Sequence, residues 1–169
     1  MTTVGVNVQT HTSTHVATNM LRSIRQIIKG CGLSATKMLT EWAVLELGVS
    51  TWLESGHLKA LVLEVFDPTD SVDDRRGRFD FTIEYRYYVD GDGDLWLDPE
   101  TVRRTILKNG SYPSNCDYRF IADTSDGYPH VDGWGETTMR STDGFTRHTM
   151  GAAIGGGSLG ASLAYYRKA

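Results

Sequence analysis

The chain has 169 residues, of which 40% are hydrophobic and 22% are charged. This composition is typical of a globular domain, and it excludes a disordered tail and a fibrous repeat. The length predicts a single domain over residues 1–169. The 17 basic and 21 acidic residues give a formal net charge of −4, and a mildly acidic surface repels phosphates. We therefore expect no direct contact with nucleic acid.

The N-terminal third predicts an arm followed by two helices. Residues 1–13 are rich in threonine and poor in large apolar side chains, which indicates either a weak edge strand or a mobile N-terminal arm. Apolar residues then recur at three- and four-residue spacing over 16–28 and again over 34–56, which predicts two amphipathic helices. Gly48 in the second helix costs about 1 kcal/mol relative to alanine, so it indicates a close approach by another segment.

The middle of the chain predicts a sheet. Leu58–Phe66 is apolar at both odd and even positions, so we expect a strand that is covered on both faces. Phe79–Tyr87 alternates apolar and polar residues and predicts a half-buried antiparallel strand. A short strand at Leu95–Leu97 precedes a third helix, in which Asp98 is the cap and Pro99 is the first residue.

The C-terminal third predicts short strands and a glycine-rich stretch. Four strands are expected, at Tyr118–Ala122, Glu136–Arg140, Phe145–Met150 and Leu163–Tyr166. A hairpin turn at Ser141–Gly144 would join the second strand to the third. Helices with broad apolar faces must bury those faces against a sheet. The predicted elements therefore indicate an α+β fold, in which three helices pack mainly on one face of an antiparallel sheet.

Two patterns that could bind a ligand lack the context that they need. Asp90, Asp92 and Asp94 open like a calcium-binding loop, but Leu95 and Thr101 stand where that loop needs glycine and glutamate. The glycines of 155–160 match a dinucleotide fingerprint, but no acidic residue follows them. The five histidines show no metal-ligand spacing. We therefore expect no metal and no cofactor.

Three further observations concern the compartment and one aromatic residue. Cys31 and Cys116 lie far apart and match no metal spacing, so we expect reduced thiols, with a single bridge as the alternative. The chain has neither a signal peptide nor ~18 consecutive apolar residues, which indicates a cytoplasmic protein without a membrane span. Trp134 stands between two glycines, where its indole either anchors a partner or caps the core.

Six fragments of the sequence, in this order and spacing, resemble a known family. They are Thr12–Leu21, Thr51–Leu58, Val131–Trp134, Arg140–Gly144, Leu159–Ser162 and Tyr165–Ala169. Together with the order of the predicted elements, they resemble HORMA domains, and most closely the bacterial HORMA family of the CBASS antiphage signalling operons. The likeness covers nearly the whole chain.

The resemblance implies a peptide-binding conformational switch and not an enzyme. A C-terminal safety belt, here residues 149–169, would wrap a closure peptide beside the helix Pro99–Lys108. The residues expected to bind the peptide are Val102, Ile106, Thr149, Met150, Leu159, Leu163 and Tyr165. Hinge freedom is expected at Gly151, Gly155, Gly156 and Gly157, and a handle for a remodelling enzyme at Thr2, Thr3 and Val4.

The resemblance also implies two protein partners. The closed form would bind and activate a cGAS/DncV-like nucleotidyltransferase, which makes a cyclic-oligonucleotide messenger. An AAA+ ATPase would open the domain again by pulling on its N-terminal region. Two alternatives stay open at this point: a small enzyme, such as a hydrolase that uses His130 or His148, and a structural adaptor that does not switch.

Overall fold

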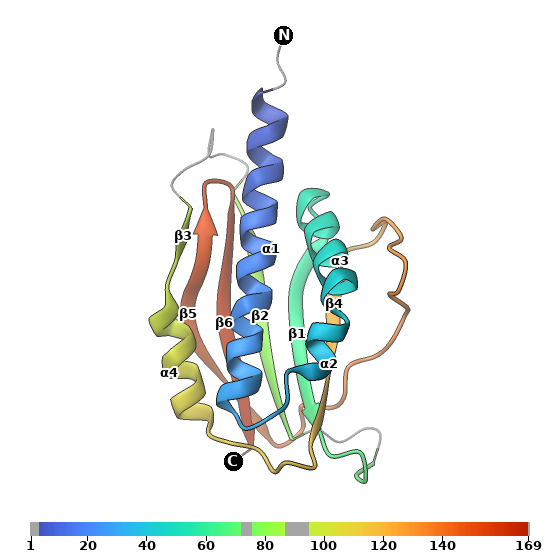
Figure 1. Cartoon of the computed structure of the whole chain (residues 1–169), viewed down its shortest axis with the longest axis vertical. Helices are drawn as coiled ribbons and strands as arrows, with labels where there is room; N and C mark the ends of the chain where they lie inside the picture. Colours follow the sequence, from blue (N-terminus) through green and yellow to red (C-terminus); the bar gives the residue numbers. More distant parts are fainter. Residues whose placement is uncertain (1–3, 72–75, 87–94, 169) are drawn as a thin grey trace.

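A computed structural model describes residues 4–71, 76–86 and 95–168 (Figure 1). These residues form helices on one face of an antiparallel sheet with the strand order β3-β5-β6-β2-β1-β4. The helices are α1 (Val4–Gly30), α2 (Thr36–Thr40), α3 (Trp42–Glu54) and α4 (Pro99–Asn109). The strands are β1 (Leu58–Phe66), β2 (Gly77–Tyr85), β3 (Trp96–Leu97), β4 (Asp117–Thr124), β5 (Phe145–Gly156) and β6 (Leu159–Lys168). The predicted α+β class and one-sided helix layer are confirmed.

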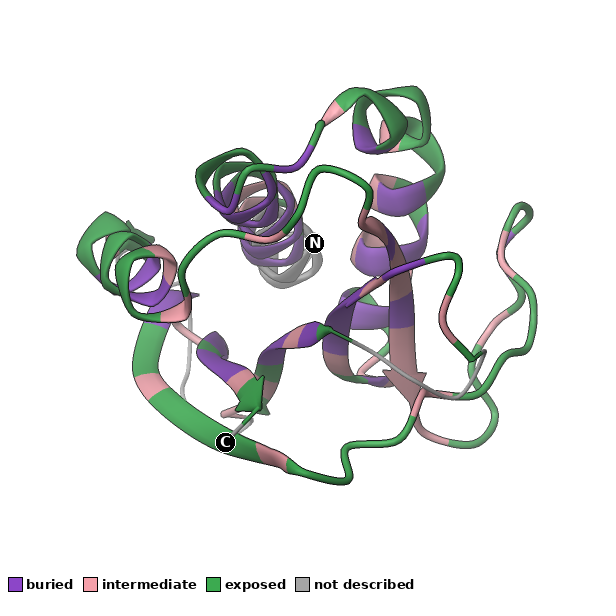
Figure 2. Ribbon diagram, turned by 90° about the horizontal axis from the view of Figure 1, so that it is seen from below, coloured by how far each residue is buried: buried purple, intermediate pink, exposed green. Residues whose placement is uncertain are grey.

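The hydrophobic core lies between the helix layer and the sheet (Figure 2). From α1, the apolar stripe that contains Met20, Leu21 and Ile24 is fully buried, and β2 places Phe79 and Phe81 opposite the helices. The helical spacing of the first stripe and the strand alternation of the second follow directly from the sequence. In the described ranges, no helix is long and apolar enough to cross a membrane.

Strand β1 lies between β2 and β4 and is buried on both faces, as predicted. Leu61 and Leu63 face the helices, whereas Val62 and Glu64 lie on the opposite face and are also 0% exposed. A carboxylate in such a place must be paired and hydrogen-bonded, because an isolated buried charge costs several kcal/mol, of order 5 or more. The partners of Glu64 are described with the site below.

The N-terminal prediction is corrected by α1. Residues 4–13 do not form an edge strand, because they belong to this helix, which begins at Val4; the mobile N-terminal arm stays a prediction. Farther along the helix, Thr12 is 1% exposed and Val16 is fully buried, so the apolar stripe of α1 packs against the rest of the domain from Thr12 onward.

The second predicted helix is two helices. Glu41, with a ψ angle of 3°, separates α2 from α3, and its N–H shares a hydrogen bond between the carbonyls of Lys37 (3.1 Å) and Met38 (3.2 Å). The apolar periodicity runs across this break, so the sequence pattern alone does not show it. Because of this break the described chain has four helices instead of the predicted three.

The expected hairpin around Ser141–Gly144 is also corrected. Residues 136–140 form no strand, and β5 runs on to Gly156, where a turn at 157–158 leads into β6. The turn signal itself is real, because the N–H of Phe145 donates to the carbonyl of Thr142 at 3.0 Å. This turn leads into β5, but it does not join two strands, because the segment before it forms no strand.

The glycine-rich stretch is regular structure. Gly151 has a φ of +96° where the register between β5 and β6 shifts, a conformation that favours glycine. Gly155 faces β3, where an added Cβ would lie 2.6 Å from Cζ2 of Trp96, and Gly156 is as tightly covered by Leu95. These contacts leave no room for a side chain at Gly155 and Gly156, and the hinge role of the glycines stays a prediction.

The predicted turn at Asp90–Asp94 lies outside the described residues.

Candidate functional site

Strand β4 forms one edge of the sheet, and a segment without helix or strand passes beside it. We call residues 125–144 the crossing segment; in Figure 1 it leaves the end of β4, bows outward past α3 and returns to begin β5. In the described part of the chain, no backbone hydrogen bond joins the crossing segment to β4. The outer N–H and C=O groups of β4 are therefore not used by a neighbouring strand, and such an edge can accept one.

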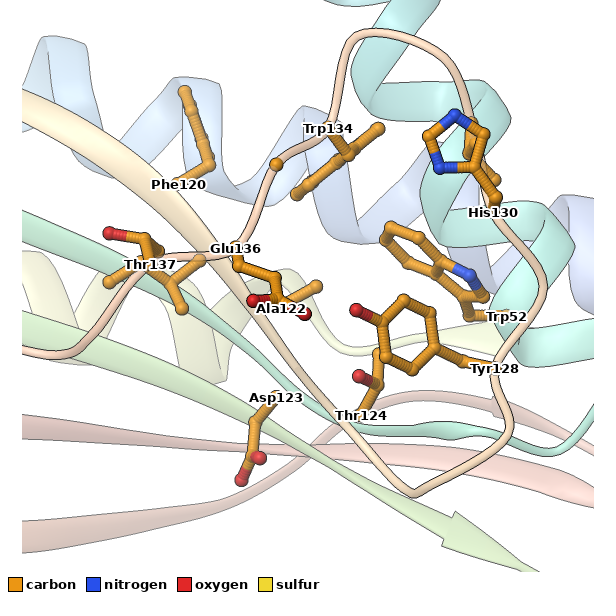
Figure 3. A pocket seen from close by; sticks show the side chains of 13 residues that line it. Trp52, Phe120, Ala122, Asp123, Thr124, Tyr128, His130, Trp134, Glu136 and Thr137 are labelled. Carbon is orange, nitrogen blue, oxygen red and sulfur yellow. The ribbon is translucent and has the colours of Figure 1, made fainter.

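A cavity of about 540 Å³ lies between β4 and the crossing segment. Figure 3 shows how three elements enclose it: β4 supplies the residues from Phe120 to Thr124, α3 supplies Trp52, and the crossing segment supplies the remaining side chains. Those of the crossing segment include Tyr128, His130, Trp134, Glu136 and Thr137. A cavity that combines aromatic walls with a few polar groups is the usual form of a ligand site.

Two tryptophans join the crossing segment to α3. The indole of Trp52 donates to the carbonyl of Pro129 at 2.8 Å, and the indole of Trp134 donates to the carbonyl of Val44 at 2.9 Å. The rings of Trp52 and Trp134 meet edge to face at 5.0 Å, and Tyr128 meets Trp52 in the same way at 5.9 Å. Edge-to-face pairs of this kind contribute about 0.5–1.5 kcal/mol each.

Gly48 is the part of α3 on which Trp134 rests. A Cβ built at Gly48 would overlap Nε1 and Cε2 of the Trp134 indole. The close approach predicted from a glycine inside a helix is therefore confirmed, and its cause is an indole from a residue 86 positions later. The ring of Trp134 packs on α3 and also lines the cavity, and its role in anchoring a partner stays a prediction.

The other end of the crossing segment is held on the far face of the sheet by Glu64. Its carboxylate accepts from Nε of Arg119 at 2.7 Å and from the backbone N–H of Arg140 at 2.8 Å. The guanidinium of Arg140 lies 4.0 Å from the centre of the Phe66 ring and donates to the carbonyl of Ser71. Arg119 also donates to the carbonyl of Thr138 at 2.6 Å. We call these contacts the Glu64 clip.

The hydroxyl of Tyr118 holds β4 beneath α2. It donates to the carbonyl of Ser34 at 2.6 Å and accepts from the N–H of Met38 at 3.2 Å. Burial raises the pKa of Tyr118, and the hydrogen bond from Met38 acts in the opposite direction. The floor of the cavity is thus fixed by α2 at one end of β4, while the crossing segment is fixed at α3 and at the Glu64 clip.

The residues predicted to bind a peptide do not line this cavity. Val102 and Ile106 lie on α4, where Val102 is buried and Ile106 packs against Gly30 of α1. Thr149 and Met150 lie on β5, and three more residues are buried along β6: Leu159, Leu163 and Tyr165. Of the predicted handle, Val4 is the first residue of α1, whereas Thr2 and Thr3 lie outside the described residues.

Neither predicted catalytic histidine contacts a nucleophile in the described part of the chain. His130 is 3.1 Å from a carboxylate oxygen of Asp132, and both side chains are largely exposed. His148 stacks on Tyr165 at 4.9 Å. Among the described residues, no group of three or more His, Cys, Asp or Glu is placed to hold a metal ion. The geometry gives the hydrolase alternative no support.

Comparison with known proteins gives a consistent result. The family model described as "Bacterial HORMA domain 2" matches residues 1–169. A chain of the mitotic checkpoint complex is similar in structure, with a TM-score of 0.68 and 9% identity over 93% of this chain and 97% of that one. C. elegans HTP-1 bound to the HIM-3 closure motif has a TM-score of 0.58 and 13% identity, over 78% and 70%.

A bacterial structure is similar over more of the chain. The E. coli MS115-1 CdnC:HORMA-deltaN complex contains a chain with a TM-score of 0.58 and 13% identity, over 95% of this chain and 89% of that one. At such identities the likeness concerns the fold. No curated protein sequence is significantly similar to this one.

Proposed function

We propose, from the premise that this chain belongs to the bacterial HORMA domain 2 family, that it is a peptide-binding switch whose ligand adds to the outer edge of β4. The observation that carries the proposal is the cavity of about 540 Å³ between that edge and the crossing segment. An extended peptide added to a sheet edge gains backbone hydrogen bonds, and pockets beside the edge select its side chains.

The proposal assigns the safety belt to the crossing segment, residues 125–144, in place of residues 149–169. The crossing segment passes outside β4 and is fastened on both sides of that strand, at α3 by Trp134 and on the far face by the Glu64 clip. Residues 149–168 instead belong to β5 and β6, with β6 paired to both β5 and β2. A belt that wraps a ligand must pass over the edge that the ligand occupies.

Two structural neighbours support this type of function. One is a HORMA-fold protein bound to a closure motif, and the other is a HORMA protein in complex with CdnC. We propose that the peptide-bound form of this chain binds and activates a cGAS/DncV-like nucleotidyltransferase in CBASS antiphage defence, and that it has no catalytic role itself. An AAA+ ATPase would return it to the peptide-free form.

Peptide selection tests the function directly. A displayed library of random heptapeptides panned on the protein is expected to yield binders, and the best of them should slow amide exchange along β4, because the new strand takes up its free groups. In size-exclusion runs, a CBASS nucleotidyltransferase should co-elute with the protein in the presence of that peptide. Binders that leave exchange in β4 unchanged, or equal co-elution without peptide, would contradict the proposal.

Deletion of residues 1–11 tests the N-terminal handle. The deletion ends before Thr12, which is 1% exposed and is the first residue of α1 shown to be buried. In Figure 1 the start of α1 extends beyond the end of the sheet, so an ATPase could grip it there. We expect peptide affinity to stay within about twofold and ATP-dependent peptide release to be lost, as measured by fluorescence anisotropy. ATP-dependent peptide release at the rate of the full-length protein would contradict the handle role of these residues.

A further inference from the structure

The walls of the cavity are negatively charged. The stretch from Phe120 to Thr138, which supplies most of the lining, contains no lysine or arginine. It contains four carboxylates, of which Asp123 and Glu136 line the cavity, whereas Asp126 and Asp132 lie outside the lining. The flanking Arg119 and Arg140 both contact the carboxylate of Glu64 on the far face of the sheet. The guanidinium of Arg119 also donates to the hydroxyl of Thr137 at 3.1 Å, so it contacts one residue of the lining.

Glu136 is the carboxylate best placed to meet a ligand. Figure 3 shows its side chain directed across the cavity toward Tyr128, while Asp123 points away from the cavity at its rim. In the described part of the chain, no ion pair or hydrogen bond engages the carboxylate of Glu136. The neighbouring His130 is 78% exposed and lies 3.1 Å from a carboxylate oxygen of Asp132.

The aromatic walls suit the rest of a long basic side chain. Lysine and arginine carry apolar stems that pack on rings while the charged end reaches a polar group. Their cations are also attracted to the faces of tryptophan and tyrosine, and three such rings, Trp52, Tyr128 and Trp134, meet around the cavity. An acidic side chain in the same place would meet the like charge of Glu136.

We infer, building on the proposed function, that the ligand of this cavity is a basic peptide: a lysine or arginine of the added strand enters the cavity and pairs with Glu136. The rings of Trp52 and Tyr128 hold the stem of this side chain, and Asp123 adds attraction at the rim. The charge of the cavity thus selects among peptides that all form the same backbone hydrogen bonds with β4.

Parallel peptide selections test the inference. A random heptapeptide library is panned on the wild-type protein and on Glu136→Gln, Glu136→Lys and Asp143→Lys, where Asp143 is an exposed carboxylate of the crossing segment that lines no part of the cavity. Wild type and Asp143→Lys should enrich lysine or arginine at one position. Glu136→Gln should weaken the best wild-type peptide about tenfold, and Glu136→Lys should enrich aspartate or glutamate at that position.

The outcomes separate this inference from the function on which it rests. Peptides that bind β4 without basic enrichment, or with an enrichment that Glu136→Lys leaves unchanged, would overturn the basic-peptide assignment and leave the switch intact. A library that yields no peptide on any variant would overturn the peptide-binding function, and this inference with it.

Discussion

Replacing Glu64 by leucine is expected to free the crossing segment from the sheet and to lower the free energy of unfolding by about 3–5 kcal/mol. The carboxylate of Glu64 is fully buried, and it is the acceptor for both Arg119 and the backbone N–H of Arg140. Leucine keeps the apolar volume but leaves two guanidinium groups and one backbone N–H without that acceptor. Urea unfolding followed by circular dichroism measures the loss.

Amide exchange at Arg140 separates release of the crossing segment from general destabilisation. In the wild type the N–H of Arg140 is bound to Glu64, so it should exchange slowly and should lose that protection in Glu64→Leu. The matched control is Glu84→Leu on the neighbouring strand, because Glu84 is 61% exposed and pairs with Arg86 at the surface. This control should change stability by less than about 1 kcal/mol. Unchanged protection of Arg140 in Glu64→Leu would show that the clip does not hold the segment.

Replacing Gly48 by alanine should weaken peptide binding at least tenfold while lowering the free energy of unfolding by only about 1 kcal/mol. The new methyl group occupies the place of the Trp134 indole, which must leave α3 and give up its hydrogen bond to Val44. The lost hydrogen bond and the lost edge-to-face contact with Trp52 cost about 1 kcal/mol each, and the better helix propensity of alanine returns about 1 kcal/mol. The cavity, however, loses one of its aromatic walls.

Gly135→Ala is the control for this experiment, because Gly135 adjoins Trp134 and a Cβ there would meet no atom within 4 Å. Fluorescence anisotropy with a selected peptide should show at least a tenfold loss of affinity for Gly48→Ala and less than a twofold change for Gly135→Ala. The indole N–H resonance of Trp134 should shift only in Gly48→Ala. Wild-type affinity together with an unshifted indole resonance in Gly48→Ala would contradict the proposed role of Trp134.

The elements with strong local signals could be predicted from the sequence. The helix α4 has the expected bounds because Asp98 caps it, accepting from the N–H of Glu100 at 3.1 Å, and Pro99 suits its first turn. Strands β1 and β2 follow from their apolar patterns, and Gly48 marked the close approach of another segment. In each case the signal lies within the element that it describes.

The site could not be predicted in this way, because its contacts join distant parts of the chain. Glu64 stands in an apolar run, and its partner Arg140 is 76 residues later in a segment without secondary structure. The crossing segment has no periodic pattern, because its place is set by contacts with Val44, Trp52 and Glu64. The apolar residues of β6 that were expected to bind a peptide are buried in the structure. Their apolar character alone does not distinguish a core residue from a ligand contact.

The position of β4 at the edge of the sheet also bears on how two copies of this protein meet. The outer backbone groups of β4 are not paired with a neighbouring strand, and once the crossing segment is displaced such an edge is a template for pairing with the same strand of another molecule, which leads to aggregation. Two copies approaching edge to edge would bring Asp123, Asp126, Asp132 and Glu136 of each against the same carboxylates of the other. Like charges at that distance repel each other, and the repulsion weakens as salt increases. The negative charge to which we assign ligand selection is therefore also expected to oppose the association of two peptide-free copies at low salt.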